Sequence, residues 1–226
     1  VVCVWGACLM RSAGCCVNDV ADRDFDKHVK RTAQRPVTSG GLSVKQALTA
    51  GAVLALCAFG LVLSTNTVTV AWSFVALVVT LIYPYAKRFV AMPQAVLGVA
   101  FSFGIPMAFA AVQSRVGAVA WLLLLGNLFW VIAYDTEYAM VDRDDDIRLG
   151  IKSTAILFAE LDRPMIAILQ VSFLITLLLI PRSVELSVYY YFGLCGASGL
   201  FIYQHYLTWD RSREGCFEAF LNNHWA

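Results

Sequence analysis

Long apolar stretches alternate with short polar connections along the whole chain. Seven windows contain almost no charged residue: Val1–Val17, Ala47–Leu63, Val68–Ala86, Ala95–Val112, Gly117–Tyr134, Met165–Ile180 and Leu186–Leu207. A helix that crosses a bilayer needs about 20 mostly apolar residues, and these windows approach or reach that length. The pattern predicts an all-α fold, a polytopic bundle of transmembrane helices.

The two ends of the chain suggest that the sequence is a fragment. The first window begins at residue 1 without a preceding polar segment, and the last segment, CFEAFLNNHWA, stops where another span could begin. We therefore expect a fragment that lacks both ends of the protein, so a targeting sequence could not be observed in it.

Composition supports a membrane protein. Hydrophobic residues make up 59% of the chain and charged residues only 15%, and the mean hydropathy is +0.68. This excludes an ordinary soluble domain. The seven cysteines have no metal-ligand spacing and mostly lie in apolar windows, so we expect small buried hydrophobic residues. His28, His205 and His224 form no cluster, and no zinc site is expected.

Basic residues are distributed unequally between alternate connections. One set of connections holds 14 of the 17 Lys and Arg residues, whereas the opposite set holds only Arg115 and Arg182. Cytoplasmic connections of membrane proteins carry the excess of Lys and Arg, so we place the basic set in the cytoplasm.

Acidic residues gather in two short stretches of that basic set. Ten of the sixteen fall there: Asp19, Asp22, Asp24 and Asp26 in one, and Asp135, Glu137, Asp142, Asp144, Asp145 and Asp146 in the other. Asp19, Asp22 and Asp26 have i, i+3, i+7 spacing, and Asp135, Tyr138 and Asp142 repeat it 116 residues later. Each set therefore lines one helical face.

Carboxylates on one helical face repel one another unless a cation lies among them. Hard oxygen ligands of this kind suit Mg²⁺. The neighbouring Lys30, Arg31, Arg35 and Lys152 suggest a diphosphate, which can bind metal ions and basic side chains at once. The simplest alternative to a metal–diphosphate site is that both stretches are solvated loops whose basic residues only reflect the excess of Lys and Arg in cytoplasmic connections. A divalent-cation transporter would place its acids near the bilayer midplane instead, and a scaffold protein has no need of two matched acidic faces.

These residues resemble a known family. NDVADRDFD fits the NDxxDxxxD motif, and DTEYAMVDRDDD fits the DxxYxxxDxxxD motif, of the UbiA superfamily of intramembrane prenyltransferases. The longer runs MRSAGCCVNDVADRDFDKHVKRTAQRPVTSG and YDTEYAMVDRDDDIRLGIKSTAILF look like its 4-hydroxybenzoate polyprenyltransferase branch, which makes a ubiquinone precursor. The resemblance implies nine helices around a cavity, capped by cytoplasmic loops that carry the Asp motifs, with residues 1–226 as one membrane-embedded prenyltransferase domain.

The resemblance also implies a reaction. A polyprenyl diphosphate would bind Mg²⁺ held by Asn18, Asp19, Asp22, Asp26, Asp135, Asp142 and Asp146, with these six aspartates as the catalytic set. Departure of diphosphate would leave an allylic cation, which the ring of 4-hydroxybenzoate attacks at the carbon ortho to its hydroxyl. The partners expected are therefore polyprenyl diphosphate, 4-hydroxybenzoate and the lipid of a bacterial inner membrane, with no nucleic acid. The nearest rival within the superfamily uses a haem, chlorophyll or naphthoate precursor as acceptor.

Further cations and rings complete the expected site. Tyr83 and Lys87 resemble the family's YxxxK element, although Lys87 could be an ordinary interfacial lysine. The expected diphosphate-binding set is Lys30, Arg31, Arg35, Tyr83, Lys87, Arg148 and Lys152. Arg11 lies within an apolar window seven residues before Asn18. It could bind the acceptor carboxylate or a polar group of another helix, and we assign it with Tyr138 to acceptor binding.

Overall fold

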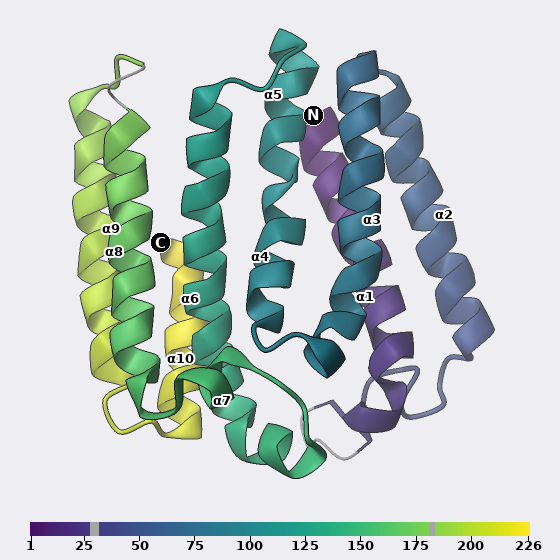
Figure 1. The fold of residues 1–226 in the computed structure, drawn as a ribbon. Coiled ribbons are helices and arrows are strands. Elements are labelled where there is room, and N and C mark those ends of the chain that lie inside the picture. The colour runs from purple at the N-terminus through teal and green to yellow at the C-terminus, as the bar shows by residue number, and fades with distance from the viewer. Residues whose placement is uncertain (28–31, 181–183) are drawn as a thin grey trace. The chain divides into compact units, whose positions relative to one another are not determined.

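The computed structural model describes residues 1–27, 32–180 and 184–226, and in this part of the chain the fold is all-α, as predicted (Figure 1). The helices are α1 (Val2–Asp26), α2 (Val44–Leu63), α3 (Thr67–Phe89), α4 (Pro93–Ser102), α5 (Gly104–Gln113), α6 (Ala118–Leu149), α7 (Thr154–Phe158), α8 (Asp162–Leu179), α9 (Val188–Leu207) and α10 (Arg213–Asn222). Short 3-10 turns follow α7 (Ala159–Leu161) and α10 (Asn223–Trp225). The chain divides into two compact units, each described here by itself.

The first unit consists of Val1–Ala86 and Phe103–Val116. Within it α1 packs along α2, and the close approach requires a small residue, because a Cβ atom at Gly51 would lie 3.2 Å from Cβ of Cys16. Ser43 begins α2 with a capping box, in which its hydroxyl accepts from the amide of Gln46 and the Gln46 side chain accepts from the amide of Ser43. The side-chain amide of Asn66 donates to the carbonyl of Ala110 at 2.7 Å, which ties the start of α3 to the end of α5.

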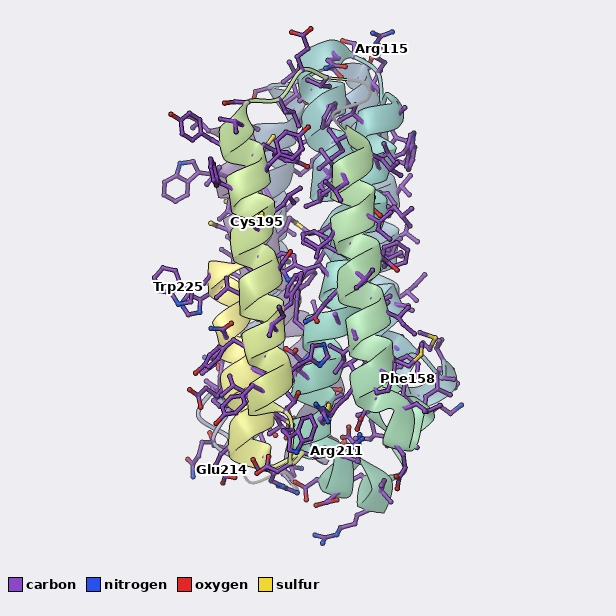
Figure 2. All side chains as sticks on the ribbon, turned by 90° about the vertical axis from the view of Figure 1, so that its left-hand side faces the viewer. Arg115, Phe158, Cys195, Arg211, Glu214 and Trp225 are labelled. Atoms are coloured by element: carbon purple, nitrogen blue, oxygen red, sulfur yellow. The ribbon has the colours of Figure 1, made fainter. Side chains whose placement is uncertain are left out.

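The second unit consists of Lys87–Ser102 and Gly117–Ala226. Its central element is α6, which packs against α4, α8 and α10, while α9 contacts α8 and α10. Figures 1 and 2 both show α8 and α9 side by side. α4 approaches α6 closely at Gly98, where an added Cβ atom would lie 2.6 Å from Cδ1 of Leu128 and would require that side chain to shift. The polar residues of α6 therefore lie on a helix that α4, α8 and α10 contact.

The apolar window Ala95–Val112 forms two helices rather than one. α4 ends at Ser102 and α5 begins at Gly104, with Pro106 in the first turn of α5. Proline has no amide hydrogen, and its ring clashes with the carbonyl four residues earlier, here that of Ser102. Pro106 therefore explains the break. α3, by contrast, continues past Pro84 to Phe89.

Among the residues that the structure describes, five helical stretches are long and apolar enough to cross a membrane: 44–63, 67–86, 93–113, 118–149 and 154–179. The predicted windows Val1–Val17 and Leu186–Leu207 form α1 and α9, which are less apolar. α1 contains Arg11 and the polar Asp motif, and α9 is rich in tyrosine and glycine. The chain is thus an integral, multi-pass membrane protein. The expectation of buried cysteines is wrong for most of them, because only Cys216 is buried and most others are exposed on helix surfaces.

Candidate active site

The first Asp motif lies at the end of α1. The helix continues from its apolar part through Asp26, so Asn18, Asp19, Asp22 and Asp26 follow one helical face, as their spacing predicted. Asp22 and Asp26 are buried, with 4% and 7% of their surface exposed, and Asp19 is partly buried. Loops do not carry this motif, which corrects the expectation taken from the resemblance.

Arg35 binds the first motif from the following connection. Its Nη1 atom lies 3.1 Å from Oδ1 of Asp19 and 3.1 Å from Oδ2 of Asp26, so one guanidinium nitrogen bridges carboxylates two helical turns apart. The hydroxyl of Thr32 also donates to the carbonyl of Asp26. Burial raises the pKa of the Asp19 carboxyl, and Asp26 and Asp22 raise it further, whereas the charge of Arg35 lowers it. These contacts hold Thr32 and Arg35 beside the carboxylate face of α1.

The second Asp motif lies on α6. This helix runs without a break from the apolar window through Asp135, Tyr138, Asp142 and Asp146, so helical turns, not a loop, carry this motif too. All four side chains are partly buried. The helix ends at Gly150, whose φ of +67° lies in the left-handed region that favours glycine and whose amide donates to the carbonyls of Asp146 and Ile147.

The other two aspartates of the DRDDD run have a different environment. Arg213, in the first turn of α10, lies 3.5 Å from Asp144 and 3.1 Å from Asp145. Arg148 also approaches Asp145, at 3.8 Å, although 78% of its side chain is exposed. The predicted diphosphate ligand Arg148 therefore lies beside an aspartate outside the predicted metal set. Asp144 and Asp145 thus bind arginines of the same unit, and neither belongs to the predicted metal set.

A buried carboxylate fastens the end of α6 to the start of α8. Asp162 is 0% exposed and binds both Arg143, next to Asp142 on α6, and Arg211, in the connection between α9 and α10. Figure 2 shows Arg211 at the same end of α9 as Glu214. Arg211 adopts a φ of +55°, and its Nη2 atom also donates to the carbonyl of Glu160. No local sequence pattern indicates this cluster, because the three residues lie far apart in the chain.

The segment that follows α6 forms hydrogen bonds with both α4 and α6. The hydroxyls of Thr136 and Thr154 lie 2.7 Å apart, and the amide of Thr154 donates to Oε1 of Gln94 at 3.0 Å. Lys152, predicted to bind diphosphate, donates instead to the carbonyl of Phe89 at 3.0 Å while its side chain remains exposed. Its amine therefore stabilises the C-terminal end of α3 in this structure.

The remaining predicted residues are less fully defined. Arg11 lies on α1 with an exposed side chain, and Tyr83 lies on α3 with a partly buried one. Lys87 belongs to α3, but its side chain lies outside the described part of the structure. Lys30 and Arg31 also lie outside the described residues.

Side chains of the described residues do not form a metal cage by themselves. Within residues 1–27, 32–180 and 184–226, no three His, Cys, Asp or Glu side chains converge as a metal-binding group. Mg²⁺ does not require such a cage, because it keeps several waters and often binds through one or two carboxylates together with phosphate oxygens of the substrate. The aspartate face of α1 and that of α6 each offer hard oxygen donors of this type, so the residues of either face fit Mg²⁺ bound with a diphosphate.

Comparison with known proteins decides the family. The family model described as the UbiA prenyltransferase family matches residues 1–226. The chain belongs to the UbiA prenyltransferase family. Among UbiA relatives, a 4-hydroxybenzoate octaprenyltransferase of Polaromonas sp. is 62% identical over 97% of this chain and 77% of its own length. A protein of the same description from Aeromonas salmonicida is 54% identical over 100% of the chain and 78% of its own length. These relatives confirm the branch inferred from the longer sequence runs.

Solved UbiA structures share the fold. A UbiA homolog from Aeropyrum pernix matches with a TM-score of 0.83 at 22% identity, over 99% of this chain and 85% of that one. A UbiA homolog from Archaeoglobus fulgidus bound to GPP and Mg²⁺ matches with a TM-score of 0.65 at 17% identity, over 90% of this chain and 75% of that one. At these identities the likeness establishes the UbiA fold alone.

Proposed function

We propose that this chain transfers a polyprenyl group from an allylic polyprenyl diphosphate to 4-hydroxybenzoate, at the ring carbon ortho to the hydroxyl, in ubiquinone biosynthesis. The single observation that carries the proposal is the pair of aspartate-lined faces on α1 and α6 in a chain 62% identical to a 4-hydroxybenzoate octaprenyltransferase. The name of that relative makes octaprenyl diphosphate the first donor to test.

The aspartates bind the donor head group through Mg²⁺. Asn18, Asp19, Asp22 and Asp26 on α1 and Asp135, Asp142 and Asp146 on α6 supply the oxygen ligands. Bound Mg²⁺ neutralises the charge that develops on the departing diphosphate. The Archaeoglobus fulgidus homolog bound to GPP and Mg²⁺ supports this pairing of metal and diphosphate.

Basic side chains contribute to the same head group. Arg35 already lies on the carboxylates of Asp19 and Asp26, where it limits their mutual repulsion and presents its remaining N–H groups to an anion. Lys152 and Arg148 are exposed near the end of α6 and can reorient toward a phosphate oxygen. Lys30, Arg31, Tyr83 and Lys87 complete the proposed set.

The acceptor is oriented by a cation and an aromatic residue. The planar guanidinium of Arg11 donates two parallel hydrogen bonds to the carboxylate of 4-hydroxybenzoate. Tyr138 contacts the acceptor ring. The bond between the allylic carbon and the diphosphate oxygen breaks first and leaves an allylic cation. The ring carbon ortho to the hydroxyl then bonds to the allylic carbon, and the ring proton at that carbon passes to the released diphosphate or to water.

We place the protein in the inner membrane of a bacterium, with both aspartate motifs on the cytoplasmic side. The unequal distribution of Lys and Arg between alternate connections supports this orientation. The polyprenyl tail remains among the membrane lipids while the diphosphate reaches the polar helix ends.

An acceptor assay tests the proposal. Membranes that contain the protein are incubated with radiolabelled octaprenyl diphosphate and Mg²⁺, with 4-hydroxybenzoate or with naphthoate, chlorophyll and haem precursors. We expect label to appear in a prenylated hydroxybenzoate. Transfer to another acceptor but not to 4-hydroxybenzoate would assign the chain to another branch of the family, and transport of a divalent cation without prenyl transfer would refute the enzymatic role.

A further inference from the structure

The end of α10 lies against the face of α6 that carries Tyr138. Cys216 and Ala219 of α10 are fully buried in this unit. The ring of Phe220 lies 4.6 Å, centroid to centroid, from that of Tyr138 and 6.0 Å from that of Tyr134. An α10 side chain thus restricts the ring to which we assign contact with the acceptor.

One amide fixes the position of α10 along α6. Nδ2 of Asn223 donates to Oε2 of Glu137 at 2.8 Å, and Oδ1 of Asn223 accepts from Nε1 of Trp130 at 3.0 Å. Trp130 and Glu137 are seven residues apart, so the amide contacts two turns of one α6 face. If the Asn223 amide were flipped, its NH2 group would face the indole N–H and its oxygen would face the carboxylate. Neither pair could form a hydrogen bond, so only the observed orientation satisfies both partners.

Burial makes this contact specific for one register. Asn223 is 7% exposed and Glu137 is 1% exposed. A shift of α10 by one residue along α6 would leave these buried polar groups without hydrogen bonds, which costs more than the bonds contribute when they are formed. The contact therefore determines which part of α10 lies beside Tyr138.

A separate set of amides ties α10 to the other helices. Nε2 of Gln204 on α9 donates to Oδ1 of Asn222 at 3.1 Å, and Nε2 of Gln170 on α8 donates to Oε1 of Gln204 at 2.9 Å. Gln204 and Gln170 are buried and Asn222 is partly buried, but neither of these hydrogen bonds joins α10 to α6. Asn222 and Asn223 are thus neighbouring asparagines with different partners, and they form a matched pair for mutation.

We propose that Asn223 is a positioning residue for the acceptor site. Through Glu137 and Trp130 it holds Phe220 against Tyr138, and this packing orients the Tyr138 side chain before the acceptor binds. Preorganisation lowers the ordering cost of binding, so its loss weakens acceptor binding more than donor binding. The inference rests on the proposed function for the role of Tyr138, although the contact itself does not.

Kinetics of four variants test the role. Asn223→Leu should raise the KM for 4-hydroxybenzoate about tenfold and leave the KM for octaprenyl diphosphate within about twofold, and Phe220→Leu should do the same. Asn222→Leu should leave both KM values within about twofold, even if it lowers the melting temperature as much. Glu137→Gln should retain the wild-type KM, because the Gln carbonyl can still accept from Asn223. Equal KM changes in Asn222→Leu and Asn223→Leu, or no change in Asn223→Leu and Phe220→Leu, would overturn the proposal.

A spectroscopic measurement separates this inference from the proposed function. With 3-fluorotyrosine at position 138, the ¹⁹F resonance should shift in Phe220→Leu and in Asn223→Leu but not in Asn222→Leu. This measurement needs no turnover. Failure of the wild-type protein to prenylate 4-hydroxybenzoate would refute the proposed function while the resonance still reports the contact. An unchanged resonance in Asn223→Leu would refute the positioning role even in an active enzyme.

Discussion

Nη1 of Arg35 lies 3.1 Å from the carboxylate of Asp26. The same atom lies 3.1 Å from Asp19, so the predicted diphosphate ligand is also a structural partner of the predicted metal-binding face. A bridging cation of this kind keeps neighbouring carboxylates close together despite their mutual repulsion. Donor binding should therefore depend on Arg35 through both the carboxylates and the diphosphate.

Replacement of Arg35 should weaken donor binding. Arg35→Met should raise the KM for the prenyl diphosphate by about tenfold or more, which corresponds to about 1.4 kcal/mol of binding free energy. Arg23→Met is the control, because Arg23 pairs with Asp24, whose side chain is 74% exposed, and exposed ion pairs contribute little. Steady-state kinetics in membranes measure both variants. If Arg23→Met raised the KM for the prenyl diphosphate as much as Arg35→Met, donor binding would depend on the net positive charge and not on the position of Arg35.

Catalysis should require Mg²⁺ and both aspartate faces. Asp22→Asn and Asp142→Asn should each lower turnover by at least about a hundredfold, because an amide cannot replace a charged metal ligand. Asp24→Asn and Asp144→Asn are matched controls on the same helices and should keep near-normal turnover. Chelation of Mg²⁺ should abolish activity, and Mg²⁺ should restore it. Normal turnover of Asp22→Asn or Asp142→Asn in the presence of chelator would contradict the metal mechanism.

Substitution of Arg11 should affect the acceptor and not the donor. Arg11→Lys should raise the KM for 4-hydroxybenzoate about tenfold or more, since an ammonium cannot form the two parallel hydrogen bonds of a guanidinium. The KM for the prenyl diphosphate should change little. An equal loss of both substrates, or a failure to fold, would make Arg11 a structural residue and would leave Arg35, Lys152 and Arg148 as partners for the carboxylate.

The buried Asp162 cluster should contribute to stability. Asp162→Ala should lower the free energy of unfolding by about 3–5 kcal/mol, because it leaves the charges of Arg143 and Arg211 without their buried partner. Thermal unfolding in detergent measures the effect. Glu160→Ala is the control, because Glu160 is exposed and offers Arg211 its backbone carbonyl, which the substitution retains. Equal melting temperatures for the two variants would contradict a stabilising role.

The orientation in the membrane can be tested by labelling. In a protein whose native cysteines have been replaced, single cysteines near Lys30 and Arg148 should react with an impermeant reagent only from the cytoplasmic side. A cysteine at Arg115 should react from the opposite side and serves as the control. Labelling near Arg148 from the outer face would reverse the predicted topology.

Periodicity in the sequence predicted the helices and the aspartate faces, because residues three, four and seven apart must share a helical face. It could not predict where the helices end: the apolar window stops at Tyr134, but α6 continues to Leu149 until Gly150 interrupts it. Nor could it predict the bond from Arg35 to Asp19, because that contact depends on the fold of the intervening connection. The contacts of Asp162 and of Asn223 likewise join distant segments, which no local pattern reveals.

The length of α6 has a consequence for where the chemistry takes place. Its 32 residues span about 48 Å at a rise of about 1.5 Å each, whereas the hydrocarbon layer is only about 30 Å thick. If Ala118 lies at one surface of this layer, Asp135 lies near the other surface and Asp146 about 16 Å farther along the helix axis. The length of the helix then sets the depth of the reaction. A long-chain donor can keep its tail in the hydrocarbon layer while its diphosphate ionises in water, and the charged head group never has to cross the lipid.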